Sequence, residues 1–227
     1  MPSRLREKAC RPPRAFVIQR PLVAVLDYGI GNLRSAQKAL QRMGADARLT
    51  ADRHLVDDAA AVVLPGVGAF GRCLEALEES GLRDVSITAA GQAVAGDKPF
   101  LGICVGMQML FEESDESPGS HGLGILKGRV KRISGDVKCP QMQWNRLKIY
   151  DGGLLFEDLP DEAWMYFVHG YATPLGPHTV ATCEYGESLC AAVQRGNLWG
   201  LQFHPEKSGN TGLKVLANFV NSLLGHS

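Results

Sequence analysis

The sequence is poor in several features that would point to particular classes of protein. Its six cysteines form no C-x-x-C pair, aromatic residues make up 7% of the chain, and Lys plus Arg balance Asp plus Glu at 24 each. No run approaches the roughly 18 apolar residues of a membrane span, and the N-terminus lacks the roughly 7–15-residue apolar core of a secretory signal. These absences predict a cytoplasmic protein with reduced thiols and no membrane contact.

The balanced charge hides an uneven distribution along the chain. Residues 1–20 contain six Lys and Arg residues against one acidic residue, Glu7, so the remaining 207 of the 227 residues carry five net negative charges. A negatively charged body argues against nucleic acid as a partner. We expect a basic, disordered tail over residues 1–21, followed by one domain over 22–227 with a single core.

Apolar runs and helical patterns alternate after the tail. The runs at 22–27, 60–65 and 98–103 are each followed by apolar residues at helical spacing, which predicts a parallel sheet covered by helices on both faces. Ligands of such sheets bind at the carboxyl ends of the strands, where three glycine-rich turns would lie. Further along, an antiparallel or mixed section of the same domain is expected from short β-like runs at 129–133, 142–149, 164–168, 179–184 and 189–194. An amphipathic helix is expected over 213–223.

The segment Gly102-Ile103-Cys104-Val105-Gly106 ends the third apolar run and opens a predicted helix over 105–113. Glycines on both sides of Cys104 allow a sharp strand-to-helix turn that leaves the thiol exposed at its tip, as in a nucleophile elbow. The positive end of the helix dipole favours the thiolate. On spacing alone, a buried structural cysteine is an equally good interpretation.

A reactive cysteine needs a base and an orienting group, and "GLQFHPEKS" contains candidates for both. Period-two alternation places His204 on the side of the strand opposite its apolar residues, with Glu206 on the same side as His204. Pro205 stiffens the spacing between them. Each residue alone has a bland explanation, but together with the elbow they indicate a Cys-His-Glu triad. H-x-E lacks the spacing of a helical metal site, so no metal is expected.

Four motifs in order, "DYGIGN", "LPGVGAFG", "GICVGMQ" and "FHPEKS", resemble the triad-type, or class I, glutamine amidotransferases. More narrowly, they resemble the glutaminase subunits of imidazole glycerol phosphate synthase, of histidine biosynthesis, over roughly residues 22–224. The resemblance implies a flavodoxin-like three-layer α/β fold with no cofactor. It also implies hydrolysis of glutamine to glutamate and ammonia through a thioester on Cys104. The ammonia would pass to a separate (β/α)₈-barrel cyclase subunit within a heterodimer.

The same resemblance implies roles for individual residues. An oxyanion hole would involve Val67, Gly68 and Val105. The glutamine site would consist of Gly68, Gln108, Glu116, Tyr166, His169 and Gly170. Contacts with the cyclase would include Asn32, Trp144 and Lys207. The chain departs from the family pattern at Gln141 and Gln143, where the family tends to have histidine and glycine, and at Gly170, where a small hydroxyl residue is usual.

Other interpretations compete with this one. The spacing Gly66-x-Gly68-x-x-Gly71 fits a dinucleotide-binding loop, but a complete strand-helix unit precedes it and no acidic residue occurs near 86–91, where the ribose would be bound. A stand-alone γ-glutamyl cysteine hydrolase would share the triad without needing a docking surface. An amidotransferase of another pathway is the nearest competitor, and a binding module with a dead site is disfavoured by the intact triad.

Overall fold

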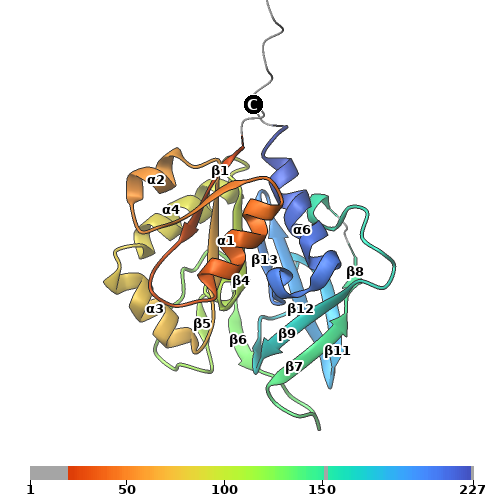
Figure 1. Ribbon diagram of the computed structural model, residues 1–227. Helices are drawn as coiled ribbons and strands as arrows, with labels where there is room; N and C mark the ends of the chain where they lie inside the picture. The colour runs from red at the N-terminus through yellow and green to blue at the C-terminus, as the bar shows by residue number, and fades with distance from the viewer. Residues whose placement is uncertain (1–19, 151–152, 226–227) are drawn as a thin grey trace, which may run out of the picture.

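The computed structural model describes residues 20–150 and 153–225, which form one α/β domain around a twisted sheet (Figure 1). Of the predicted tail, residues 1–21, all but Arg20 and Pro21 lies outside the described residues. The sheet order is β2-β1-β3-β4-β13-β12-β11-β8. Its parallel strands are β1 (Leu22–Leu26), β2 (Asp46–Thr50), β3 (Ala61–Gly66), β4 (Phe100–Cys104) and β13 (Leu198–Leu201). Its antiparallel strands are β8 (Lys148–Ile149), β11 (Thr179–Tyr185) and β12 (Glu187–Arg195).

Helices cover both faces of this sheet, which confirms the predicted three-layer arrangement. In Figure 1, α1 (Leu33–Arg42) and α6 (Gly209–Ser222) lie in front of the strands and α4 (Arg83–Val94) lies behind them. The other helices are α2 (Arg53–Asp58), α3 (Phe70–Glu79) and α5 (Val105–Gln108). Within the described ranges, every helix falls short of the length and apolar character that a membrane crossing requires.

Most strands between β4 and β11 do not join the main sheet. The run predicted as one strand over 142–149 divides at Leu147: β7 (Gln141–Arg146) pairs with β9 (Trp164–His169), whereas β8 joins the edge of the main sheet. We call β7 and β9 together the β7–β9 ribbon. A third, small sheet contains β5 (Glu113–Ser114), β6 (Arg129–Arg132) and β10 (Tyr171–Ala172), and two 3₁₀ turns, η1 (Leu154–Phe156) and η2 (Pro205–Lys207), complete the elements.

The central strands are buried on both faces, because helices cover both sides of the sheet. Every residue of β3 and of β4 is buried, which explains why these strands appear in the sequence as continuous apolar runs. The alternation of apolar and polar residues along 199–204 was predicted to put His204 on a side opposite the apolar residues, but both sides of this segment are buried. Gln202 and His204 are as inaccessible as Trp199, at 0%, 2% and 3% exposure.

The turn from β4 into α5 has the strained geometry of a nucleophile elbow. Cys104 adopts φ 55° and ψ −113°, a conformation that costs a non-glycine residue about 1–3 kcal/mol. The glycines around it permit a very close approach: a Cβ on Gly106 would lie 1.8 Å from the carbonyl oxygen of Leu64, and one on Gly66 would lie 2.7 Å from the nitrogen of Gly106. The glycines therefore hold α5 against the end of β3.

Two details of the elbow differ from the sequence prediction. The helix ends at Gln108 rather than continuing to 113, and the segment from Met109 onward turns towards β5. Cys104 is only 3% exposed rather than open at the tip, since the end of β9 covers it and the Val168 carbonyl oxygen lies 3.9 Å from its sulfur. The thiol faces a narrow cavity and not bulk solvent.

The close approach at Gly106 makes a direct prediction about stability. Gly106→Ala forces a Cβ into the Leu64 carbonyl and should lower the free energy of unfolding by about 3 kcal/mol, or about 6–12 °C in Tm. The matched control is Gly91→Ala, at a helical position in α4 with no atom within 4 Å of the added Cβ. That change should stabilise the protein by about 0.5–1 kcal/mol. Equal melting temperatures for the two variants in thermal unfolding would contradict the packing described here.

Candidate active site

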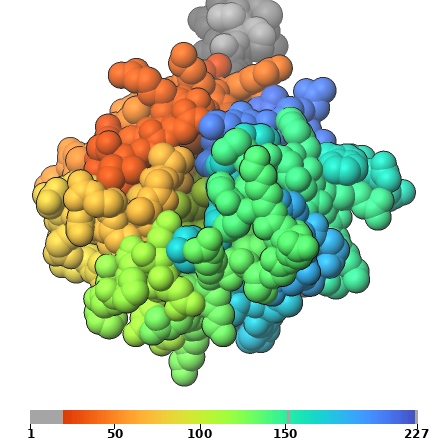
Figure 2. All heavy atoms as spheres, turned by 90° about the horizontal axis from the view of Figure 1, so that it is seen from below, coloured from red at the N-terminus to blue at the C-terminus, as the bar shows by residue number. Residues whose placement is uncertain are grey.

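The predicted functional residues gather at the carboxyl ends of β3 and β4, the end of the molecule that Figure 2 shows from below. A cavity of about 70 Å³ opens there beside Cys104, and we call it the thiol cavity. Its lining comes from the turns after β3 and β4, from the end of β9 and from the segment after β13: Val67, Gly68, Cys104, Val105, Gln108, Glu116, Val168, His169, Gly170, Tyr171 and His204.

His204 and Glu206 form a buried charged pair at one side of the cavity. The Nδ1 atom of His204 lies 2.9 Å from Oε1 of Glu206, and both side chains are 2% exposed. Burial alone would lower the pKa of His204, but its interactions with Cys104 and Glu206, including the hydrogen bond to Glu206, raise that pKa to about 10. These surroundings favour the imidazolium form of the ring.

The second ring nitrogen of His204 is the one available to a reacting group. Within the described part of the chain, Nε2 is buried and has no hydrogen-bond partner. His204 and Cys104 line the same cavity, so a group bound there can reach both side chains. Catalytic hydrogen bonds that are long or unformed are common in an apo active site.

The backbone of the β7–β9 ribbon holds His204 in place. The N–H of His204 donates to the carbonyl of Tyr166 at 3.0 Å, and the N–H of Tyr166 donates to Oγ of Ser208 at 2.9 Å. The Ser208 hydroxyl in turn donates to the carbonyl of His204 at 2.6 Å. Because Glu206 lies in η2 rather than in an extended strand, it reaches His204 by a turn of the chain and not by strand alternation.

The predicted oxyanion-hole residues lie on two facing turns. Gly68 adopts φ +88°, in the left-handed region that favours glycine, and the Cys73 thiol donates to the carbonyl of Val67 at 3.2 Å. In a trans peptide the C=O and the following N–H point in opposite directions, so the Gly68 N–H points away from Cys73. Val105 begins α5 directly after the sulfur-bearing residue. Tyr28 braces the turn by donating to the Pro65 carbonyl at 2.6 Å.

Five of the six residues predicted to bind glutamine line the cavity, and Tyr166 does not. Its ring packs edge-on against Trp144, with centroids 6.1 Å apart, on the outer face of the ribbon. Glu116 makes two kinds of contact, one of which the sequence did not indicate. Its Oε2 accepts a hydrogen bond from the N–H of Phe70 at 2.8 Å, capping α3, while the side chain lines the cavity.

His169 is held neutral by its surroundings. Burial lowers its pKa to about 4, outweighing the hydrogen bond between Nδ1 and the Tyr171 carbonyl at 2.8 Å. Since a carbonyl can only accept, Nδ1 carries the proton and Nε2 must accept. In the structure the Gln141 atom 3.0 Å from Nε2 is Oε1, which cannot donate, and Gln141 Nε2 is buried without a partner among the described residues. A neutral His169 therefore requires the Gln141 amide to be turned so that its NH₂ group donates to Nε2.

Of the two other departures from the family pattern, Gly170 has a structural correlate and Gln143 has none. A Cβ on Gly170 would lie 3.2 Å from Sγ of Cys139, so a hydroxyl side chain there would crowd that thiol. Cys139 also lies 3.5 Å from the Gly170 carbonyl. Gln143 is exposed on β7, and nothing in the structure explains that substitution.

The residues predicted to contact a partner lie outside the lining of the thiol cavity. Trp144 is 47% exposed on β7, and a Cβ on Gly209 at the start of α6 would lie 3.9 Å from its ring. Lys207 is an exposed residue of η2, next to Glu206, and the half-buried Asn32 precedes α1.

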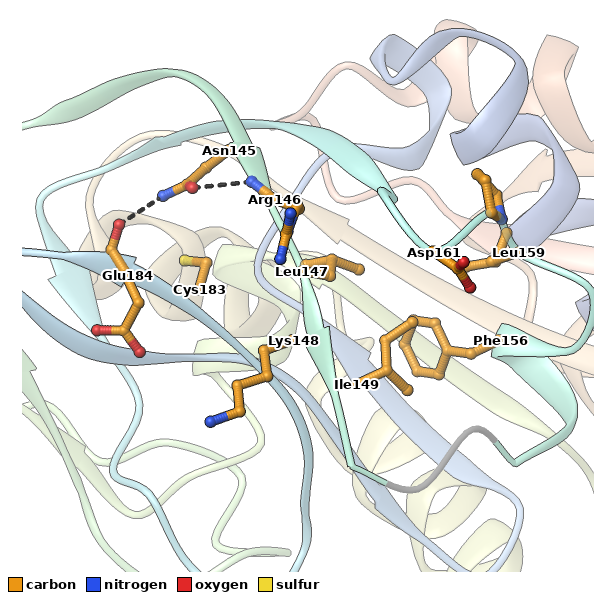
Figure 3. A pocket seen from close by; sticks show the side chains of 11 residues that line it. Asn145, Arg146, Leu147, Lys148, Ile149, Phe156, Leu159, Asp161, Cys183 and Glu184 are labelled. Atoms are coloured by element: carbon orange, nitrogen blue, oxygen red, sulfur yellow. Dashed lines mark hydrogen bonds between the residues drawn. The ribbon is translucent and has the colours of Figure 1, made fainter.

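A larger hollow of about 620 Å³ lies along β7 and β8, away from this site (Figure 3). Its lining contains side chains of both charges, the cationic Arg146 and Lys148 and the anionic Asp161 and Glu184. The Asn145 amide donates to the Glu184 carbonyl at 2.9 Å. Cys104, His204 and Glu206 are not among its lining residues. Its size therefore does not make it the candidate active site.

The fold and the site together have the geometry of a cysteine-dependent hydrolase on a flavodoxin-like scaffold. The family model for class-I glutamine amidotransferases matches residues 24–223, and the chain belongs to this family.

Individual relatives place the chain more narrowly. It is 50% identical over 200 residues to "Imidazole glycerol phosphate synthase subunit HisH" of Methanothermobacter thermautotrophicus, covering 88% of this chain and 98% of that protein. It is 44% identical over 207 residues to the HisH subunit of Deinococcus radiodurans, covering 89% and 94%. Among solved structures, PurLQS from Thermotoga maritima matches with a TM-score of 0.69 at 24% identity, covering 90% of this chain and 100% of that one, which shows the shared fold.

The neutral His169 predicts a pH dependence of stability. Between pH 6.5 and about 4 the unfolded chain binds a proton on this histidine and the folded chain does not, so stability falls as the pH falls through this range. The loss is at most about 3 kcal/mol. His169→Gln should show a shallower decrease in the urea-derived free energy of unfolding between pH 6.5 and 4.5 than the wild type. The control His121→Gln, at a side chain 74% exposed, should follow the wild type. Parallel curves for all three proteins would contradict the assignment.

Proposed function

We propose that this chain is the glutaminase subunit of an imidazole glycerol phosphate synthase in histidine biosynthesis, with Cys104, His204 and Glu206 as its triad. It hydrolyses glutamine to glutamate and ammonia and delivers the ammonia to a partner subunit. The observation that carries the proposal is the buried pair of His204 and Glu206, 2.9 Å apart, beside a cysteine held in a strained elbow. Membership of the amidotransferase family and the names of the relatives support the same function.

The reaction begins from a thiolate–imidazolium pair. The Cys104 sulfur attacks the carboxamide carbon of glutamine, and His204 then gives its proton to the nitrogen, so that the C–N bond breaks and ammonia leaves. The neutral His204 next takes a proton from water, whose hydroxide attacks the γ-glutamyl thioester. The C–S bond breaks, glutamate leaves, and the pair is restored. The raised pKa of His204 supports a role as acid in the first half of the cycle.

The tetrahedral intermediates carry a negative oxygen that needs hydrogen-bond donors. The N–H groups of Gly68 and Val105 are suited to this role, because both residues line the thiol cavity beside Cys104. Gln108, Glu116, His169 and Gly170 lie further around the same cavity, where they could bind the amino-acid portion of glutamine. Tyr166 is better suited to the partner surface than to glutamine, since its ring packs against Trp144.

The outer face of the β7–β9 ribbon is suited to a partner subunit. The strand pairing puts Met142, Trp144 and Trp164 on one face, at 63%, 47% and 46% exposure. Exposed aromatic and methionine side chains grouped in this way are typical of protein interfaces. The ribbon also ends at the thiol cavity, so a subunit bound here would lie next to the ammonia released. The partner that we propose is the (β/α)₈-barrel cyclase, in a heterodimer, with Asn32 and Lys207 adding polar contacts.

The assay of choice measures glutamate formation with and without the cyclase and its ribonucleotide substrate. We expect weak glutaminase activity alone and a large increase in the complete mixture, since ammonia is useful only beside its acceptor. Cys104→Ala should lose more than about a thousandfold in kcat, because it removes the nucleophile. The control Cys190→Ala, in β12 and outside the cavity, should keep its activity.

Two results would overturn parts of this proposal separately. Full activity of Cys104→Ala would remove the assigned nucleophile. Equal turnover with and without the cyclase would refute the coupling, and would favour a stand-alone γ-glutamyl hydrolase.

The partner surface has its own test. Trp144→Ala removes a large exposed ring from the centre of the apolar face and should weaken binding of the cyclase by about 2 kcal/mol, roughly 30-fold in Kd. Leu175→Ala, a residue 54% exposed and outside the ribbon, serves as the control and should bind normally. Titration calorimetry giving the same Kd for Trp144→Ala and wild type would exclude this face as the interface.

A further inference from the structure

Gln202 is a completely buried amide that touches the sulfur of Cys104. It follows β13 and lies two residues before His204, and its side chain has 0% exposure. Its Nε2 lies 3.8 Å from Sγ of Cys104, a distance suited to an N–H···S hydrogen bond, and its Oε1 accepts from Nε2 of Gln108 at 3.0 Å. The mechanism described above does not use this residue.

The direction of this amide is fixed by a chain of hydrogen bonds that starts at the backbone. The carbonyl of Tyr171 can only accept, and it accepts from Nε2 of Gln108 at 3.0 Å. The same NH₂ group of Gln108 donates to Gln202, which must therefore present its oxygen to Gln108. The NH₂ group of Gln202 is left facing the sulfur. A flipped Gln202 would place two NH₂ groups against each other in a buried site, so its orientation does not depend on telling nitrogen from oxygen.

We propose that Gln202 is a positioning residue for the nucleophile, which donates a hydrogen bond to the Cys104 sulfur and stabilises it as a thiolate. A hydrogen bond to a charged acceptor is stronger than one to a neutral acceptor, so the bond favours the ionised sulfur over the thiol. It also opposes rotation of the side chain away from His204. The sulfur thus has a hydrogen-bond donor on the side of β13, while His204 lines the cavity that the sulfur faces.

The other ionisable side chains near the Cys104 sulfur are all still present when Gln202 alone is substituted. Tyr28 and Cys73 lie close enough for the charge of Cys104 to act on them, and Glu116 and His169 line the same cavity. Glu206 acts on the sulfur through His204. Because all of these remain, a change in the pH profile of Cys104 in a Gln202 variant reports the loss of the amide donor.

The test uses the full chain and measures alkylation of Cys104 by iodoacetamide between pH 6 and 10, quantified by mass spectrometry of the peptide that contains it. Gln202→Met keeps the length and apolar volume of the side chain but removes the donor. We expect about tenfold slower alkylation at neutral pH, with the midpoint of the profile moved to higher pH and a lower thiolate absorbance. The control Gln92→Met, at an exposed position of α4, should match the wild type.

A merely structural role for Gln202 would have a different signature. It would lower the melting temperature of Gln202→Met and leave the midpoint of the alkylation profile in place, and that result would overturn the proposal. Gln202→Leu, which also lacks the donor, repeats the test if the methionine variant does not fold.

The inference rests on the proposed function only where it assigns Gln202 a role in glutamine hydrolysis. The role of Gln202 and the proposed function can therefore be refuted separately. Alkylation does not require glutamine, so a wild-type profile in both Gln202 variants refutes the role of Gln202 whatever the enzyme does. Absence of glutamate formation by the wild-type complex would instead refute the proposed function and leave the alkylation result standing.

Discussion

The close contact between α5 and the end of β3 is the constraint on which the site depends. Gly106 packs against the carbonyl of Leu64 at a distance that no side chain permits, and Cys104, two residues earlier, has a positive φ. The contact brings the turn after β3 beside the turn after β4, and so places Gly68 and Val105 around one sulfur. Replacing Gly106 or Gly66, the two glycines of this contact, would move the turn that contains Gly68 away from Cys104 and Val105.

Electrostatics adds a second level of organisation. The pKa values of the two histidines at the cavity are shifted in opposite directions: the interactions of His204 with Cys104 and Glu206 raise its pKa, whereas burial, with the charge of His204, lowers that of His169. The buried amides of Gln108 and Gln202 link the Tyr171 carbonyl to the sulfur. The direction of these two amides is thus fixed, which limits their reorganisation during turnover.

Much of this was predictable from the sequence, because the motifs are local. The alternation of apolar runs and helical patterns predicted the layers, and the glycines around Cys104 predicted the elbow. The sequence did not show that helix α5 would be a single turn or that β7 and β8 would part at Leu147, since both depend on tertiary packing. The role of Gln202 was not predictable, although the alternation that places His204 also puts Gln202 on the same side of the chain. Its function depends on Gln108, 94 residues away in the sequence.

The central claim is that Cys104 carries the γ-glutamyl group during turnover. The complex with the cyclase can be mixed with glutamine, quenched in acid within a few turnovers, digested and analysed by mass spectrometry. We predict that the peptide containing Cys104 gains the mass of one γ-glutamyl group, and that His204→Gln, which lacks the acid that protonates the departing ammonia, gains little or none. Glutamate formation by the wild-type complex with the group attached to another residue, or to none, would contradict the account.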